Sequence, residues 1–162
     1  MPNFVKVEDF NPCYLGKENS IVYFGRLSEE KGLFTLIKAV ENIPGVILKI
    51  IGDGPLKEKL ELEVKERKIK NIKFLGYLGG ENLKNKIQDA LFIIYPSECY
   101  ENNPLSIIEG FALGKPVIGA RIGGIPELVR DNETGLTFEP GNPEDLQAKI
   151  EPIPFEEAID DI

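Results

Sequence analysis

The chain has 162 residues, the length of a single domain, and 42% of them are hydrophobic, which is enough for a normal core. A formal net charge of −8 without a basic run excludes the usual nucleic-acid and anionic-membrane binders. The chain has no histidine, so it cannot itself supply a His-based triad, a His metal site or a histidine general base. Cys13 and Cys99 are too few for a disulfide framework, lack metal-ligand spacing and have no obvious basic activator.

The first ten residues do not read as a signal peptide, and no apolar run approaches the roughly 18 residues of a membrane span. We therefore expect a soluble domain of a reducing, cytoplasmic compartment. Six short apolar runs, each closed by Gly or Pro chemistry, predict strands over 21–24, 46–51, 72–75, 91–95, 116–119 and 136–138. These runs are nearly continuous rather than alternating, which is typical of strands covered on both faces.

Amphipathic stretches with helical spacing lie between the apolar runs. Their expected inner faces are 33/36/37/40, 56/60/64, 83/87/90 and 105/108/112, and a last helix runs from Asn142–Pro143 to about 150. Strands and helices that alternate in this way predict an α/β fold, a doubly wound, three-layer Rossmann-like domain with a parallel sheet. In the common order 3-2-1-4-5-6 the first and fourth strands are neighbours, and the loops that begin at Gly25 and Pro96 flank the crevice.

The loop over 25–32 carries two cations, Arg26 and Lys31. Lys31 stands near the start of the first helix, where the macrodipole disfavours a cation by about 0.3–1 kcal/mol. A bound phosphate would reverse that penalty, because backbone N–H groups and both cations could address it together. The alternative is a solvated loop in which Lys31 pairs with Glu29 or Glu30. The position of the loop at the expected crevice favours phosphate binding.

The loop over 96–104 precedes a helix for which we expect Asn103 as the N-cap and Pro104 at the first helical position. Glu101 lies before this helix and Glu109 lies on its second turn. Two such carboxylates could accept hydrogen bonds from the hydroxyls of a sugar and a ribose. Alternatively, Glu101 only favours the helix N-terminus electrostatically and Glu109 lies on the surface, and the spacing leaves both interpretations open.

Three further features have plain structural explanations. The segment 52–55 (GDGP) follows the second strand, but Lys57 stands where a dinucleotide fingerprint needs glycine, so we expect a tight turn. The pair Gly123–Gly124 either approaches a ligand closely or forms a turn before a short helix. Tyr77 follows the third strand, where it could stack on a base or cover the strand edge.

In order along the chain, these motifs resemble the C-terminal, donor-binding half of a retaining glycosyltransferase of family 4, an enzyme of the GT-B type. The resemblance covers nearly the whole chain. Residues 25–32 (GRLSEEKG) match the family's phosphate loop, and 101–109 (ENNPLSIIE) match its E-x7-E motif. Further matches are the interdomain stretch over 2–12 and the segments 114–118 (GKPVI), 123–129 (GGIPELV) and 132–136 (NETGL). Each motif alone is weak, but the five motifs from residue 25 onward, in this order and spacing, are specific.

The resemblance implies that Arg26 and Lys31 bind the diphosphate of a UDP- or GDP-linked sugar and stabilise it as a leaving group. With Glu101, which would hold the hydroxyls of the transferred hexose, they are the expected catalytic residues. Glu109 would hold the ribose. The remaining donor-binding residues implied are Gly25, Tyr77, Asn102, Asn103, Pro104, Leu105 and Ser106. No metal and no cofactor are expected, since the two cations neutralise the leaving charge.

The resemblance divides the chain into an interdomain linker over 1–19, the nucleotide-sugar domain over 20–150 and a tail over 151–162 that is truncated relative to the family. The acceptor-binding domain lies outside this chain, so we expect weak donor binding and no turnover by the chain alone. That other half could bring the protein to the inner face of a membrane, in polysaccharide, lipopolysaccharide or glycolipid assembly. Two alternatives are a stand-alone nucleotide- or phosphate-binding module and a fragment of a GT-B-type nucleotide-sugar epimerase.

Two residues depart from the family pattern. Cys99 stands where relatives often carry an aromatic residue, which leaves the local packing open. Gly110 replaces the usual alanine after the second glutamate of the E-x7-E motif, at an expected helix cost of about 1 kcal/mol.

Overall fold

The computed structural model describes residues 19–101 and 104–153 of the chain. The described residues form one six-stranded sheet with the order β3-β2-β1-β4-β5-β6, in which every neighbouring pair is parallel. This confirms the predicted fold class and strand order. The strands are β1 (Ser20–Phe24), β2 (Ile47–Ile51), β3 (Ile72–Gly76), β4 (Phe92–Tyr95), β5 (Val117–Ala120) and β6 (Gly135–Phe138).

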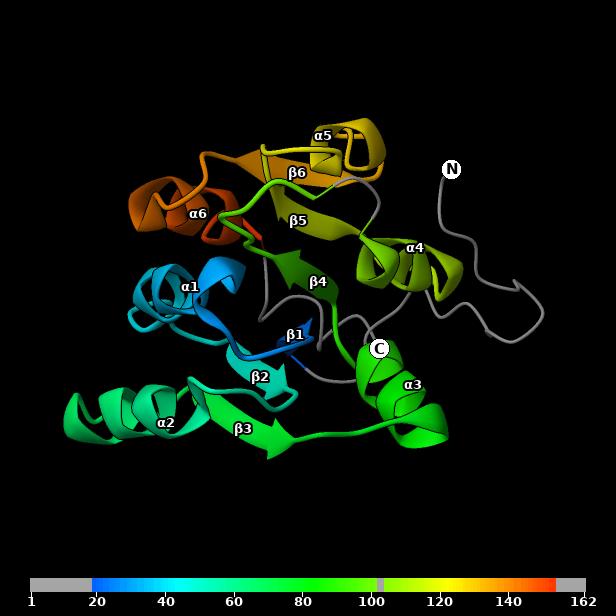
Figure 1. Ribbon diagram of the computed structural model, residues 1–162. Coiled ribbons are helices and arrows are strands. Elements are labelled where there is room, and N and C mark those ends of the chain that lie inside the picture. Colours follow the sequence, from blue (N-terminus) through cyan, green and yellow to red (C-terminus); the bar gives the residue numbers. More distant parts are fainter. Residues whose placement is uncertain (1–18, 102–103, 154–162) are drawn as a thin grey trace.

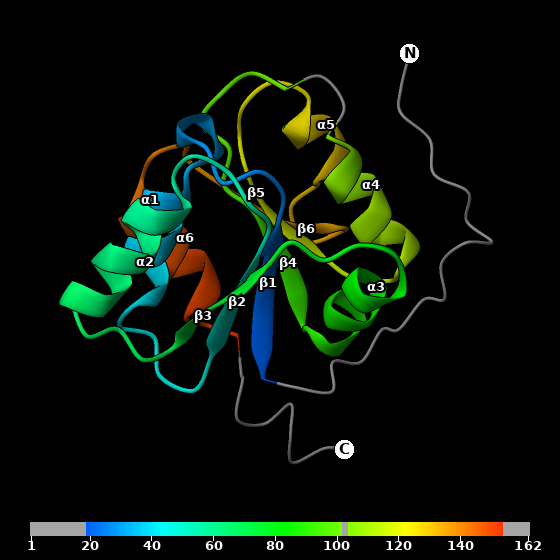
Figure 2. The same ribbon diagram turned by 60° about the horizontal axis from the view of Figure 1, so that its bottom comes forward.

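Helices cover both faces of the sheet (Figures 1 and 2). One face carries α1 (Leu33–Val40), α2 (Lys57–Glu66) and α6 (Pro143–Ile150), and the other carries α3 (Gly80–Asp89), α4 (Leu105–Ala112) and α5 (Ile125–Leu128). A 3-10 turn, η2 (Glu29–Lys31), immediately precedes α1. The molecule is therefore the three-layer sandwich that the alternation of apolar runs and amphipathic stretches predicts.

The strand β1 shows why its apolar run is continuous. Ile21 and Tyr23 pack into the cluster under α1, α2 and α6, whereas Val22 and Phe24 pack into the cluster under α3, α4 and α5. All four side chains are buried. Because successive side chains of a strand point to opposite faces, a strand covered on both sides needs apolar residues at every position.

The helix α4 differs from its prediction in two ways. It begins at Leu105, so Pro104 occupies the N-cap position with an extended backbone instead of the first helical position, and Asn103 lies outside the described residues. The predicted inner face is also wrong, because the residues that α4 buries are Ile107 and Gly110 while Leu105 is 41% exposed.

Gly110 explains why α4 turns this face, with Ile107 and Gly110, toward the sheet. A Cβ at Gly110 would overlap Cδ1 of Ile93 in β4 and would touch Val117 in β5. The missing side chain lets α4 lie directly on these two strands, so the glycine that weakens the helix allows a closer contact with the sheet.

The ends of the expected domain fall mostly outside the described residues. The expected linker over 1–19 is described only at Asn19, whose side-chain amide donates to the carbonyl of Gly45. The expected tail over 151–162 is described over 151–153, where Ile153 packs against the core. Within 19–101 and 104–153, no helix is long and apolar enough to cross a membrane.

Candidate functional site

The loops after β1 and β4 meet at the edge of the sheet formed by the carboxyl ends of the strands, as the strand order predicts. The amide of Glu98 donates to the carbonyl of Glu30 at 2.8 Å and joins the two loops directly. Gly32 has a φ of +71°, and a Cβ at this position would overlap the carbonyl oxygen of Pro96. Glycine is therefore required here on both counts, and its absence of a side chain brings the two loops into contact.

Lys31 and Glu101 form an ion pair across this contact. The ammonium nitrogen of Lys31 lies 2.7 Å from Oε1 of Glu101, and the two side chains are 22% and 14% exposed. Ser97 Oγ donates to the same oxygen at 3.2 Å, and the hydroxyl of Tyr95 donates to Oε2. The alternative in which Lys31 pairs with Glu29 or Glu30 is therefore wrong, because its partner lies 70 positions away in the sequence.

The carboxyl group of Glu101 is held in its ionised form. Burial alone would raise its pKa, but the hydrogen bonds from Lys31 and Tyr95 outweigh burial and keep the pKa below its ordinary value. Burial raises the pKa of Tyr95, so its hydroxyl stays protonated and remains a donor. Glu101 is thus a preformed hydrogen-bond acceptor at the crevice.

Glu109 lies in a different environment. It is half-buried on the second turn of α4, and burial raises the pKa of its carboxyl group. Among the described residues it has no hydrogen-bond or ion-pair partner. It therefore lies at the surface of α4 in a partly desolvated position. A partly desolvated carboxylate without a partner gains from any hydroxyl donor that a ligand brings.

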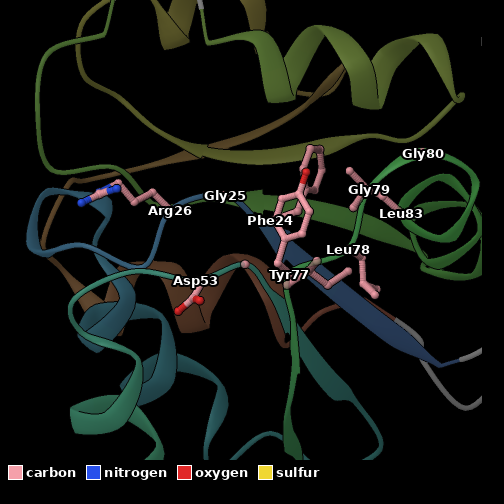
Figure 3. A pocket seen from close by; sticks show the side chains of 11 residues that line it. Phe24, Gly25, Arg26, Asp53, Tyr77, Leu78, Gly79, Gly80 and Leu83 are labelled. Carbon is pink, nitrogen blue, oxygen red and sulfur yellow. The ribbon is translucent and has the colours of Figure 1, made fainter.

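A pocket of about 490 Å³ opens at the carboxyl ends of β1, β2 and β3, within the size range of small-molecule sites. Figure 3 shows Phe24 and Tyr77 on one side of this pocket and Arg26 on the other, with the Arg26 guanidinium directed away from the two rings. Tyr77 is 78% exposed, so one face of its ring is available to a ligand. The full lining consists of Phe24, Gly25, Arg26, Ile51, Gly52, Asp53, Tyr77, Leu78, Gly79, Gly80 and Leu83.

Backbone hydrogen bonds join the loops that build this pocket. The amide of Gly25 donates to Ile51 at 3.0 Å, and that of Leu27 donates to Asp53 at 2.9 Å. The segment 52–55, predicted only as a tight turn, therefore packs against the phosphate-loop candidate and contributes Gly52 and Asp53 to the pocket. The pair of glycines after the second strand was the available signal, because close backbone approach often requires glycine.

The structure brings the predicted residues together in two groups. Gly25, Arg26 and Tyr77 line the pocket, and Lys31 and Glu101 form the ion pair. At the start of α4, Pro104 is buried, Ser106 is half-buried and Leu105 is exposed. Asn102 and Asn103 lie outside the described residues.

Two further groups lie against Glu101. The Gly123–Gly124 pair packs against the backbone of Glu101, and the amide of Gly124 donates to the carbonyl of Glu101 at 2.5 Å. The thiol of Cys99 lies 3.7 Å from Oε1 of Glu101, within the range of a weak S–H donor. The described residues contain no group of three or more His, Cys, Asp or Glu side chains that could hold a metal.

Sequence reasoning missed two tyrosines. The hydroxyl of Tyr23 in β1 donates to the carbonyl of Arg26 at 2.7 Å, and the hydroxyl of Tyr95 in β4 donates to Glu101. Both occur inside apolar runs, where a tyrosine cannot be distinguished from an ordinary core aromatic residue by pattern alone.

Comparisons with known proteins identify the family of the chain. The family model of glycosyl transferases group 1 matches residues 9–154. An uncharacterized glycosyltransferase of Methanocaldococcus jannaschii, MJ1178, is 35% identical over 135 residues, which cover 83% of this chain and 38% of that protein. The sulfoquinovosyl transferase SQD2 of Arabidopsis thaliana is 32% identical over 161 residues, with 90% of this chain and 31% of that protein covered.

Solved structures show the same fold. HepE of Anabaena, crystallised with UDP and glucose, superposes with a TM-score of 0.74 at 26% identity and covers 82% of this chain and 37% of that chain. A sucrose-phosphate synthase of Thermosynechococcus elongatus superposes with a TM-score of 0.82 at 28% identity over 96% of this chain and 43% of that chain. The chain spans about a third of the curated relatives, 38% and 31% of the two named above. It belongs to the glycosyl transferases group 1 family.

Proposed function

We propose that this chain is the donor-binding half of a retaining glycosyltransferase of family 4, which moves a hexosyl group from a nucleoside-diphosphate sugar to an acceptor. The observation that carries the proposal is the pocket that has Phe24 and Tyr77 on one side and Arg26 on the other. A nucleoside diphosphate needs both, because its base is a flat aromatic ring and its phosphates are anions.

The two cations divide the work on the diphosphate. Arg26 is exposed and has no ion-pair partner among the described residues, so its guanidinium is available to an incoming phosphate. Lys31 belongs to the same loop and already contacts Glu101. As the sugar–oxygen bond breaks, negative charge grows on the leaving diphosphate, and two fixed cations stabilise it without a bound metal. Metal independence is part of this proposal.

The two carboxylates would bind the hydroxyls of the two sugars of the donor. Glu101, ionised and held by its neighbours, would accept hydrogen bonds from the hydroxyls of the transferred hexose, and Glu109 would accept those of the ribose. The first amides of α4, at Leu105 and Ser106, lack partners within the helix and would add contacts to phosphate or sugar. Asn102, Asn103 and Pro104 complete the proposed donor contacts.

The donor is proposed to be a UDP- or GDP-linked sugar. Support for UDP comes from HepE, solved with UDP-glucose, which is 26% identical to this chain with a TM-score of 0.74. A lipopolysaccharide core glycosyltransferase of Rhizobium meliloti, LpsE, is 31% identical over 134 residues. We propose a role in polysaccharide, lipopolysaccharide or glycolipid assembly, on the cytoplasmic side of a membrane.

Acceptor binding is proposed to belong to the part of the protein that this chain does not include. The chain spans 38% of MJ1178 and 31% of SQD2. The chain by itself should therefore bind donor and transfer nothing. Sugar transfer by the isolated chain would contradict this division of labour.

Isothermal titration of the chain with UDP, GDP, ADP and NAD tests the proposal. We expect one nucleoside diphosphate to bind selectively, even if only with a dissociation constant of about 1 mM, or about −4 kcal/mol. Arg26→Ala should weaken that binding by about 1.5–3 kcal/mol, the range for hydrogen bonds to charged groups. The matched control is Arg130→Ala, because Arg130 lies on the surface with its side chain 70% exposed. Equal affinity for Arg26→Ala and the unchanged chain would place the phosphate elsewhere.

A further inference from the structure

Tyr95 is the last residue of β4 and is 7% exposed. It contacts both members of the ion pair at the crevice. Its hydroxyl donates to Oε2 of Glu101, and the ammonium nitrogen of Lys31 lies 5.8 Å from the centroid of its ring. That separation is within the roughly 6 Å over which a cation is attracted to an aromatic face.

The strand and the loop differ in rigidity, which gives Tyr95 its importance. Glu101 lies in the loop after β4, whereas Tyr95 lies in a strand with β1 on one side and β5 on the other. Its direct partner in β5 is Gly119. A side chain on an interior strand is held more precisely than one on a loop, so the sheet orients the loop carboxylate through this hydroxyl.

The two oxygens of Glu101 are held from different sides. Oε2 accepts from Tyr95, and Oε1 accepts from Lys31 and Ser97 and, more weakly, from the thiol of Cys99. This arrangement prevents the carboxylate from rotating about its terminal bond. Each carboxylate oxygen offers about two lone-pair sites, so Oε1 is fully occupied and Oε2, which has the single donor Tyr95, keeps roughly one for a ligand hydroxyl. The orientation of that remaining site depends on the Tyr95 hydroxyl.

We propose that Tyr95 is a positioning residue of this site, which orients the Glu101 carboxylate so that its free lone pair faces the hydroxyls of the transferred sugar. This inference rests on the proposed function, since it needs Glu101 to meet a sugar. Tyr95 itself does not touch the donor. Tyr95→Phe keeps the ring beneath Lys31 and removes the hydroxyl, so it separates the two contacts of Tyr95.

The surroundings of Glu101 supply two matched controls. Tyr23 of β1 is also buried, but its hydroxyl donates to the carbonyl of Arg26, so Tyr23→Phe removes a buried hydroxyl without removing a contact to Glu101. Tyr100 is 74% exposed and has no hydrogen-bond partner among the described residues, so Tyr100→Phe should change nothing. The titratable groups that face Glu101 are Lys31, Tyr95 and Cys99. Burial and, in addition, the negative charges of Glu101 and Glu30 raise the pKa of Tyr23 and so keep its hydroxyl protonated.

The first measurement follows the Glu101 carboxyl carbon by NMR in chain labelled with ¹³C-glutamate, across an acid titration, with Glu101→Gln as the assignment control. Tyr95→Phe should raise the pKa of Glu101, because it removes a donor that stabilises the ionised form. Tyr23→Phe and Tyr100→Phe should leave it unchanged. An unchanged pKa in Tyr95→Phe overturns the proposal, whether or not any nucleotide binds.

The second measurement compares a nucleoside diphosphate with its sugar conjugate by isothermal titration. The probes are UDP against UDP-glucose and GDP against GDP-mannose. Tyr95→Phe should lower the affinity for the sugar conjugate by about tenfold. It should change the affinity for the free diphosphate by less than about twofold, because only the conjugate contacts Glu101. Equal losses for both probes would reduce Tyr95 to a structural residue and overturn the proposal. If the unchanged chain binds none of the four probes, it is the proposed function that fails.

Discussion

The ammonium nitrogen of Lys31 lies 2.7 Å from Oε1 of Glu101 and thereby joins the loop after β1 to the loop after β4. Both residues belong to motifs that the proposed function assigns to the donor, one to its diphosphate and one to its sugar. In the free chain these opposite charges stabilise each other. Arg26 is exposed and forms no ion pair within 4 Å among the described residues, so in the proposed function its guanidinium is the more accessible of the two cations.

The stability of the chain should depend on Glu101 in the acid range. Its folded-state pKa is lowered, so its contribution is present above the ordinary glutamate pKa and is lost as the pH falls through the folded-state pKa. Urea unfolding of the chain and of Glu101→Gln between about pH 3 and pH 7 measures this. The unchanged chain should lose more stability on acidification than the variant, and parallel profiles would contradict the prediction.

Glu109 should act with the opposite sign. Burial raises its folded-state pKa, so its contribution is present below the ordinary glutamate pKa and is lost as the pH rises through the raised value. Glu109→Gln should therefore be more stable than the unchanged chain near neutral pH, in the same urea titrations. A variant that is less stable at neutral pH would mean that Glu109 has a favourable partner.

The proposed ribose contact makes Glu109 selective between ligands. Glu109→Ala should weaken binding of the nucleoside diphosphate by about 1.5–3 kcal/mol. It should leave the binding of inorganic pyrophosphate unchanged, because pyrophosphate has no ribose hydroxyls. Isothermal titration with both ligands gives the two affinities, and the control is Glu61→Ala on the exposed surface of α2. Equal losses for the two ligands would refute the ribose role.

The contact between the two site loops should depend on Gly32. Its φ is +71°, and Gly76 has nearly the same φ of +73° but open space where a Cβ would lie. Gly76→Ala should therefore cost only the conformational penalty, about 1–2 kcal/mol. Gly32→Ala should cost about 1–3 kcal/mol more, because its Cβ overlaps the Pro96 carbonyl. Chemical denaturation of both variants measures the difference, and equal costs would show that the loops separate freely.

The close contact of α4 with the sheet predicts a coupling between two positions. Gly110→Ala gains up to about 1 kcal/mol in helix propensity, but it forces Cδ1 of Ile93 to move, at about 1–3 kcal/mol. Ile93→Val removes that methyl group and by itself costs about 0.5–1.5 kcal/mol. In a double-mutant cycle followed by urea denaturation, the double variant should be more stable than the sum of the single changes. Additivity would mean that Gly110 and Ile93 do not share this space.

Much of the fold could be predicted because it depends on local patterns. The apolar run at 21–24 and its five counterparts identify strands covered on both faces, and the alternation with helices leaves few topologies. The strand order in turn brings the loops at Gly25 and Pro96 together. The inner face of α4 could not be predicted, because it depends on how closely Gly110 approaches Ile93 across the sheet.

The chain's sequence by itself determined the doubly wound fold, the loops that carry charged side chains and the resemblance to a glycosyltransferase donor domain. These follow from the spacing of residues along the chain, because the periodicity of apolar residues determines which segments form helices and strands. Only the tertiary structure decided that Lys31 pairs with Glu101 rather than with a neighbouring glutamate, that Asp53 lines the pocket and that Tyr95 holds the carboxylate. Each of these is a contact between residues of different loops or strands, and such contacts depend on distances in space that spacing along the chain does not contain.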